Sequence, residues 1–260
     1  MSRGAETALV TGASSGIGLE LARCFAASGS DVVLAARNAD VLEKVAAELA
    51  TAYGARAIPI ACDLSTPHGA RALIDAIAAL DLTIDVVVNS AATGPVQPIA
   101  EADLEEQLGI VDLNVRSLTE LTVRYWPGMV ERGRGGVLNV GSLSSFAAAP
   151  FVSVYGASKA YVLSFTEALW EEARGTGVNV SCLCPGATRS NFHQRAGWEK
   201  YPGGQARRMA ANRVAAFGYE AFRANRRLAI PGFGNRLGRR VLGWLPDNLL
   251  LRIMRNAFSN

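Results

Sequence analysis

The segment Thr11-Gly12-Ala13-Ser14-Ser15-Gly16-Ile17-Gly18 decides the fold of this chain. It follows a short β-rich run at residues 7–10 and opens residues 16–27, where apolar side chains recur at helical spacing until Gly29. A glycine loop between a strand and a helix N-terminus lets the backbone approach a phosphate group. The spacing Gly-x-x-x-Gly-x-Gly differs from the Gly-x-Gly-x-x-Gly fingerprint, so the position of the loop carries more weight than its glycines.

Outward from this loop, strand-like and helix-like segments alternate along the chain. The apolar run Asp85-Val-Val-Val-Asn89 is typical of a strand buried on both faces of a parallel sheet. The alternation predicts an α/β fold with a Rossmann-type doubly wound parallel sheet, helices on both faces, and one domain over residues 1–260. The expected strands are 31–36, 56–61, 84–89, 136–140, 178–184 and 228–231, and the expected helices are 39–52, 67–80, 101–129 (divided near Gly109 or at Pro127) and 154–174.

Composition narrows the class of protein. Half of the 260 residues are hydrophobic and 19% are charged, which suits a chain with a large core. No signal-peptide h-region and no apolar run of membrane-spanning length is present, so we expect a cytoplasmic protein. The four cysteines form no CxxC pair, and we expect reduced thiols, no metal site, and Cys182 and Cys184 on opposite faces of their strand.

The residues after the second expected strand indicate which nicotinamide cofactor would bind. An acidic residue there binds the ribose of NAD, whereas a basic residue accommodates the 2′-phosphate of NADP. The strand ends Ala35-Ala36-Arg37-Asn38, so Arg37 is placed to pair with a phosphate and Ser14 to add a hydroxyl contact. We therefore expect NADP(H). The cofactor contacts expected from these two segments are Gly12, Ser14, Ser15, Gly16, Ile17, Gly18, Arg37 and Asn38.

A tyrosine and a lysine four residues apart, Tyr155 and Lys159, share one face of the helix expected at 154–174. Reduction of a carbonyl needs a proton for the developing alkoxide, and an ammonium group nearby lowers the high pKa of a tyrosine. Ser142, in the serine-rich loop before this helix, is placed to donate a hydrogen bond to the substrate oxygen. The three residues predict an acid–base centre for carbonyl or alcohol substrates.

Taken together, these motifs resemble the short-chain dehydrogenase/reductase family, in its NADP-preferring bacterial branch. The resemblance covers roughly residues 6–192. The motifs that carry it are Thr11-Gly12-x-x-x-Gly16-x-Gly18, Asp63-Leu64, Asn89-x-Ala91, Asn114, Ser142, Tyr155-x-x-x-Lys159 and Pro185-Gly186.

The resemblance implies a role for each of these positions. Tyr155 would be the general acid/base, Lys159 would bind the nicotinamide ribose and lower the tyrosine pKa, and Ser142 would orient the carbonyl. Asn114 would hold a water molecule in a proton relay. Further cofactor contacts would come from Asp63, Leu64, Asn89, Ala91, Pro185, Gly186, Thr188 and Ser190.

Two positions depart from the family pattern. Ala92 stands where the family has glycine, which puts a Cβ atom near the expected path of the cofactor, and Ser190 replaces a threonine. An NADP(H)-dependent reductase, acting reversibly on a small ketone, aldehyde or secondary alcohol, is the main interpretation. A catalytically silent NADP(H)-binding sensor is the alternative that Ala92 supports. The family also leads us to expect a homodimer or homotetramer.

The C-terminal part differs in charge from the rest. Residues 1–188 carry 12 basic and 20 acidic side chains, whereas residues 189–260 carry 14 basic and 3 acidic ones. The expected substrate loop, about 187–203, contains Phe192, His193, Trp198 and Tyr201, which with Phe146 and Phe151 suggest a lipophilic substrate.

The tail, about 235–260, reads as two short basic amphipathic helices. They would pack on the domain or a sister subunit, or attach to an anionic membrane as in a lipid reductase. No nucleic-acid motif accompanies them, so we expect no nucleic-acid binding.

Overall fold

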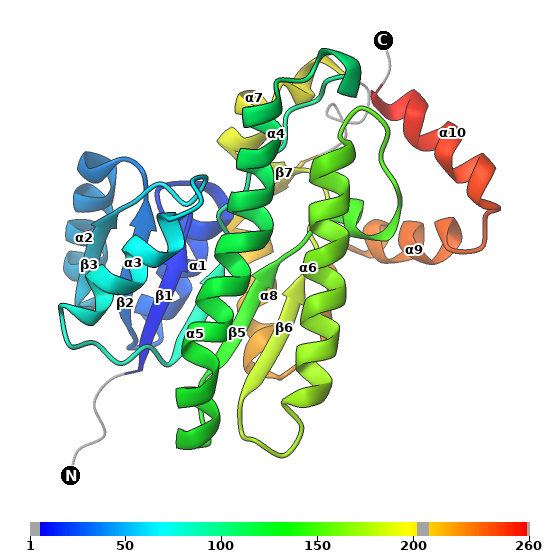
Figure 1. Ribbon diagram of the computed structural model, residues 1–260. Coiled ribbons are helices and arrows are strands. Elements are labelled where there is room, and N and C mark those ends of the chain that lie inside the picture. The colour runs from blue at the N-terminus through cyan, green and yellow to red at the C-terminus, as the bar shows by residue number, and fades with distance from the viewer. Residues whose placement is uncertain (1–5, 202–207, 259–260) are drawn as a thin grey trace.

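A seven-stranded parallel sheet forms the centre of the computed structural model, which describes residues 6–201 and 208–258 (Figure 1). The strand order is β3-β2-β1-β4-β5-β6-β9, so the order reverses between β1 and β4. The strands are β1 Thr7–Thr11, β2 Asp31–Ala36, β3 Ala57–Ala61, β4 Val86–Asn89, β5 Gly136–Val140, β6 Asn179–Leu183 and β9 Leu228–Ala229. The predicted doubly wound fold is confirmed.

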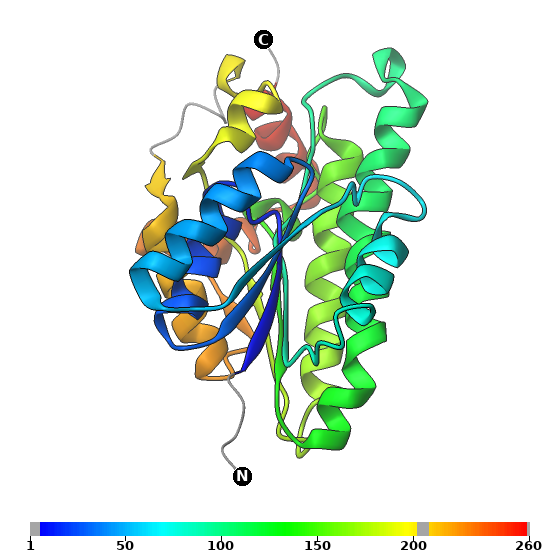
Figure 2. The same cartoon turned by 90° about the vertical axis from the view of Figure 1, so that its left-hand side faces the viewer.

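Alternate residues of each strand enter two separate cores. Val10, Leu34 and Leu138 pack under α1 Gly16–Ala27, α2 Ala39–Tyr53 and α8 Ala211–Arg223. The neighbouring residues Leu9, Val33 and Val137 pack under α3 Gly69–Ala78, α5 Ser117–Arg132 and α6 Ser153–Glu172. This period of two, with both faces covered, explains why the strands are apolar throughout. Figure 2 shows the two helical layers on opposite sides of the sheet.

The helical region expected at 101–129 is divided near Gly109, the first of the two predicted positions. After η1 Ile99–Glu101, α4 Leu104–Val111 passes into a π-helical turn, η2 Asp112–Arg116, and then into α5. The division therefore falls after Val111 and not at Pro127, which lies inside α5. π-helical turns are often found at functional sites, and this one carries Asn114.

Between β6 and β9 the chain builds small elements that sequence periodicity did not reveal. They are β7 Thr188–Arg189, α7 Asn191–Arg195, η4 Trp198–Lys200 and β8 Met209–Ala210, and α8 was also not predicted. The tail forms α9 Phe233–Leu242 and α10 Asp247–Phe258, near the expected bounds. Residues 202–203 of the expected substrate loop and 259–260 of the expected tail lie outside the described residues. In the described ranges, no helix is both long enough and apolar enough to cross a bilayer.

The cysteines of β6 are placed differently from the prediction. Cys182 and Cys184 are buried, and their Sγ atoms lie 3.6 Å apart. The expectation of opposite faces was wrong, because residues two apart on a strand share a face. All four cysteines are free thiols.

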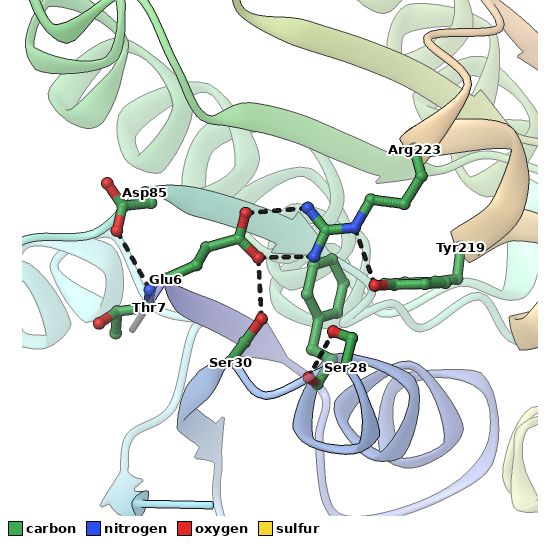
Figure 3. A network of polar contacts seen from close by, with 8 residues as sticks. Glu6, Thr7, Ser28, Ser30, Asp85, Tyr219 and Arg223 are labelled. Atoms are coloured by element: carbon green, nitrogen blue, oxygen red, sulfur yellow. Dashed lines mark hydrogen bonds and ion pairs between the residues drawn. The ribbon is translucent and has the colours of Figure 1, made fainter. Parts of the chain in front are cut away.

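One polar network ties the start of β1 to α8 (Figure 3). The Arg223 guanidinium donates to both carboxylate oxygens of Glu6, at 2.8 and 2.6 Å, and to the Tyr219 hydroxyl at 2.8 Å. Its centre also lies 5.1 Å from the ring centroid of Phe25. Ser30 donates to Glu6 as well, so the network joins β1, the turn before β2, α1 and α8.

We expect Arg223→Met to lower the free energy of unfolding by about 1–2 kcal/mol, since it removes a bidentate ion pair and a cation–π contact together. Urea unfolding measures the change. Arg174→Met, which breaks only the solvent-exposed pair with Glu171, is the matched control and should have no measurable effect. Equal losses for the two variants would contradict the role assigned to Arg223.

Candidate active site

A cavity of about 1450 Å³ lies at the carboxyl edge of the sheet, where the strand order reverses. Ligands of open α/β sheets bind at such a switch point. Of the expected site residues, eighteen line this cavity and two do not. Those that line it are Gly12, Ser14, Ser15, Gly16, Ile17, Gly18, Arg37, Asn38, Asp63, Leu64, Ala91, Ser142, Tyr155, Lys159, Pro185, Gly186, Thr188 and Ser190.

The glycine loop presents the open N-terminus of α1 to the cavity. Gly12 has a φ of +68°, and a Cβ atom there would lie 2.9 Å from the Cα of Ala91, so the loop needs glycine at this position. Ser15 occupies the N-cap position but forms no side-chain hydrogen bond to the helix. The first N–H groups of a helix have no partner within it, and with the helix dipole they form a site for an anion such as a pyrophosphate.

Arg37 lies at the far end of the same cavity, and its side chain is exposed. In the described residues it forms no ion pair, so its guanidinium is available to a ligand phosphate. Burial works to raise the pKa of nearby Asp63, but hydrogen bonds from Ser65 and the charge of Arg37 hold it below its ordinary value. Asn38 lines the cavity too, although its Oδ1 already accepts a hydrogen bond from the Val41 N–H at 3.0 Å and caps α2.

Tyr155 and Lys159 lie one turn apart on α6, and both are buried. The Lys159 ammonium donates to the Val140 carbonyl at 2.8 Å and lies 5.9 Å from the centre of the Tyr155 ring. Gly94 allows this packing, because a Cβ atom there would lie 2.3 Å from the ring of Tyr155. No sequence signal marked Gly94, a single glycine in an irregular loop.

Burial shifts both groups toward their neutral forms. It raises the pKa of Tyr155 to about 12, although the interaction with Ser142 works in the opposite direction. It lowers the pKa of Lys159 to about 8. The expectation that Lys159 depresses the tyrosine pKa stays a prediction, since burial is the largest influence on the Tyr155 hydroxyl here. At neutral pH the phenol is protonated and can act as a proton donor.

Ser142 is held by a capping box at the start of η3 Leu143–Phe146. Its Oγ accepts from the Ser144 N–H at 3.1 Å, while its own N–H donates to the Ser145 hydroxyl at 3.2 Å. A hydroxyl oxygen that accepts from the backbone keeps its O–H free to donate. Ser142 can thus present a hydrogen-bond donor inside the cavity next to Tyr155.

Asn89 and Asn114 do not line the cavity, contrary to expectation. The buried amide of Asn89 donates to Asn139 at 2.8 Å and to Thr122 at 3.2 Å, so it joins β4 to β5 and α5. This side chain thus has a structural role, and its expected cofactor contact stays a prediction. Both amide hydrogens of Asn114 are also used, by the Thr93 carbonyl and the Ser158 hydroxyl. The expected water relay therefore cannot use its side chain as donor.

Aromatic side chains from distant segments form the wall near Tyr155. The rings of Phe192 and Trp198 lie 5.6 and 5.5 Å from that of Tyr155, and Phe258 of α10 lies 5.0 Å from Trp198. The Trp198 indole N–H donates to the Gly94 carbonyl at 2.8 Å. Of the six residues expected in a lipophilic pocket, Phe146, Phe192, His193 and Trp198 line the cavity, while Phe151 and Tyr201 pack behind it.

The tail completes this wall, and sequence patterns did not predict that contribution. Asn235, Arg239 and Trp244 line the cavity from α9 and the turn after it, and Met254 and Phe258 line it from α10. The Arg239 guanidinium lies 4.6 Å from the ring centroid of Phe146. The inner faces of the two tail helices therefore pack on their own domain, which is one of the expected interpretations of the tail.

The lowered pKa of Lys159 makes a prediction about stability and pH. Between about pH 8 and pH 10.5 the unfolded chain holds a proton on this lysine that the folded chain has lost, so stability rises with pH in this window. Relative to Lys159→Met, the free energy of unfolding of the wild type should rise by up to about 3 kcal/mol as pH increases from about 7.5 to 10. Urea unfolding at several pH values tests this, with Lys44→Met as an exposed-lysine control. A difference that does not change with pH would contradict the assignment.

Comparison with known proteins agrees with this architecture. The profile of the short chain dehydrogenase family matches residues 6–200. A 1-deoxy-11-beta-hydroxypentalenate dehydrogenase of Streptomyces exfoliatus is 36% identical over 84% of this chain and 80% of its own length. A ketoacyl reductase of Nostoc is 35% identical over 70% of this chain, a stretch that covers 63% of the reductase.

Solved structures agree over nearly the whole chain. A short-chain dehydrogenase from Sphingobium yanoikuyae, determined in complex with NADPH, has a TM-score of 0.81 at 29% identity and covers 93% of this chain and 96% of its own. A 7beta-hydroxysteroid dehydrogenase has a TM-score of 0.86 at 25% identity, with 96% of each chain covered. With the switch-point cavity and the shared α6 face of Tyr155 and Lys159, these matches show that the chain belongs to the short chain dehydrogenase family.

Proposed function

We propose that this protein is an NADP(H)-dependent oxidoreductase that interconverts a carbonyl compound and the corresponding alcohol. The observation that carries the proposal is the convergence of Ser142, Tyr155 and Lys159 on the cavity that also holds the open N-terminus of α1. The NADPH complexes of two structural neighbours, the Sphingobium dehydrogenase and an L-sorbose reductase of Gluconobacter frateurii, support the choice of cofactor.

The residues present fit the cofactor. The N-terminus of α1 would hold the pyrophosphate and Arg37 the 2′-phosphate, and Asp63 and Leu64 would flank the adenine. The ammonium of Lys159 has three N–H groups, and only one is used by Val140, so the other two remain for ribose hydroxyls. When bound, the nicotinamide supplies or accepts the hydride.

The protein's own groups handle the substrate oxygen and its proton. Ser142 donates a hydrogen bond that orients the carbonyl oxygen toward the Tyr155 hydroxyl. The protonated phenol then donates its proton to the oxygen as negative charge develops there, which is general acid catalysis. The aromatic wall excludes water from this proton transfer. In the oxidative direction the same groups act in reverse.

A lipophilic substrate fits the wall best. Phe146, Phe192, Trp198 and Phe258 line the space beside Tyr155. The hydroxypentalenate and hydroxysteroid dehydrogenases named above act on compounds of this kind by their descriptions. We therefore propose a bulky apolar ketone, aldehyde or secondary alcohol.

The proposal extends to the setting in which the enzyme works. The four free thiols suit the reducing cytoplasm. Exposed apolar residues on the helices of the nucleotide-binding part, Val123 of α5 and Tyr161 of α6, suit assembly as a homodimer or homotetramer.

Turnover is tested by following NADPH absorbance with short ketones, aromatic aldehydes, 3-oxoacyl thioesters and steroid ketones. We expect Tyr155→Phe to lower kcat by about two to four orders of magnitude, because it removes the general acid. Tyr161→Phe, which removes a tyrosine hydroxyl from the outer face of the same helix, is the control and should keep the wild-type rate. NADPH binding without turnover on any substrate would favour the silent sensor.

Cofactor choice is tested separately with Arg37→Asp. Removing the cation and adding a carboxylate should shift the ratio of kcat/KM for NADPH over NADH by about 10- to 100-fold toward NADH. Arg71→Asp makes the same charge change on α3, outside the cavity, and should leave the ratio unchanged. An unchanged ratio for Arg37→Asp would show that this arginine does not meet the 2′-phosphate.

A further inference from the structure

The C-terminal hairpin, defined as α9, α10 and their connection (residues 233–258), carries an exposed apolar face. Phe233, Leu237, Val241 and Trp244 recur at positions i, i+4, i+8 and i+11, which places them on one side of α9 and the turn that follows. Phe233 is 74% exposed and Trp244 is 90% exposed. Figure 1 shows the hairpin standing out from the sheet layers beside α6, so the rest of the fold leaves this face open.

Positive charge surrounds the apolar face. The hairpin contains five arginines, at positions 236, 239, 240, 252 and 255, and one acidic residue, Asp247. Within the described part of the chain, none of the five pairs with a carboxylate. A strip of apolar side chains flanked by unpaired arginines is the pattern of a helix that lies in the interface of a membrane.

The composition of α9 favours an external partner for this face. Gly234 and Gly238 lie inside this ten-residue helix, and each costs about 1 kcal/mol in helix propensity relative to alanine. A short helix of this kind depends on burial of its apolar face, yet its large apolar side chains Phe233, Leu237 and Val241 are exposed.

We propose that the C-terminal hairpin binds the surface of an anionic phospholipid membrane. The apolar residues of α9 enter the boundary of the acyl chains and Trp244 lies at the headgroup level. The arginines outside the cavity wall, Arg236, Arg252 and Arg255, contact lipid phosphates. A second copy of the chain fits less well, because two-fold pairing through this face would bring the arginines of both copies together. An anionic bilayer satisfies the apolar strip and the arginines at the same time.

The opposite face of the same hairpin forms part of the cavity wall. Asn235 and Arg239 of α9 and Met254 and Phe258 of α10 line the cavity next to the aromatic residues around Tyr155. A hairpin with lipid on one face and the cavity on the other places the substrate space beside the bilayer. If the proposed reductase activity holds, the substrate class becomes lipophilic carbonyl compounds that partition into membranes.

The test is flotation of the full chain with phosphatidylcholine vesicles that contain, or lack, phosphatidylglycerol. The wild type should float with the anionic vesicles only, and increasing salt should release it. Leu237→Ser/Val241→Ser should reduce flotation about tenfold or more, since both side chains are exposed and outside the cavity wall. Tyr53→Ser/Leu80→Ser removes two equally exposed apolar side chains from the other end of the molecule and should float like the wild type.

The electrostatic part is tested with Arg252→Gln/Arg255→Gln against Arg71→Gln/Arg174→Gln, which removes the same charge elsewhere. Only the first pair should weaken flotation, again by about tenfold or more. Circular dichroism checks that each variant is folded. The proposal is overturned if the wild type does not float, if the hairpin and control variants float equally, or if the hairpin variants change only the sedimentation of the protein, which would identify a contact between copies.

Turnover of a short, water-soluble carbonyl without vesicles separates this proposal from the enzymatic one. The Leu237→Ser/Val241→Ser variant should keep that turnover while losing flotation. Flotation without turnover in the wild type would instead leave the membrane proposal standing and overturn the reductase.

Discussion

The reversal of strand order between β1 and β4 is the constraint on which the rest of the molecule depends. Right-handed connections leave these neighbouring strands toward opposite faces of the sheet, so their carboxyl ends cannot both be covered by the same helix. The cavity forms there, and every catalytic or phosphate-binding group reaches it from the end of a strand or the start of a helix. Sheet and helices act as a rigid support, with Tyr155 and Lys159 on α6 itself, while the glycine loop and Ser142 reach the cavity from loops.

Burial at this edge sets the electrostatics of the active site. Tyr155 and Lys159 both lie in a region from which water is largely excluded, and each is shifted toward its neutral form. Burial of the Lys159 amine costs stability, because with a pKa of about 8 this lysine is still largely protonated at neutral pH. The hydrogen bond from the Lys159 amine to the carbonyl of Val140, the last residue of β5, fixes the position of the lysine. This amine is therefore oriented before any ligand binds.

Much of the fold and of the phosphate-binding part of the site could be predicted, because both depend on local patterns. The glycine loop, the apolar strands and the Tyr155–Lys159 spacing are short-range signals, and the structure brings these residues to one cavity. The hydrogen bonds of Asn89 and Asn114 could not be predicted, because a motif gives a residue type and not the direction of its side chain. The effect of burial on the pKa of Tyr155 could not be predicted either, since desolvation depends on packing that the sequence does not display. Gly94, the inner face of α9 and Phe258 act through long-range contacts, which no periodicity reveals.

The contacts of the Trp198 indole bear on how the cavity of such an enzyme can change during evolution. The indole bonds to the loop after β4 through Gly94 and packs against Tyr155 and against Phe258 near the end of the chain. The cavity wall beside Tyr155 is thus built in part from the loop of Gly94 and from a C-terminal segment, neither of which carries a proposed phosphate-binding or proton-transfer group. New shapes of this wall can therefore arise through changes in these two segments, while the glycine loop and the Tyr155–Lys159 face of α6 stay the same.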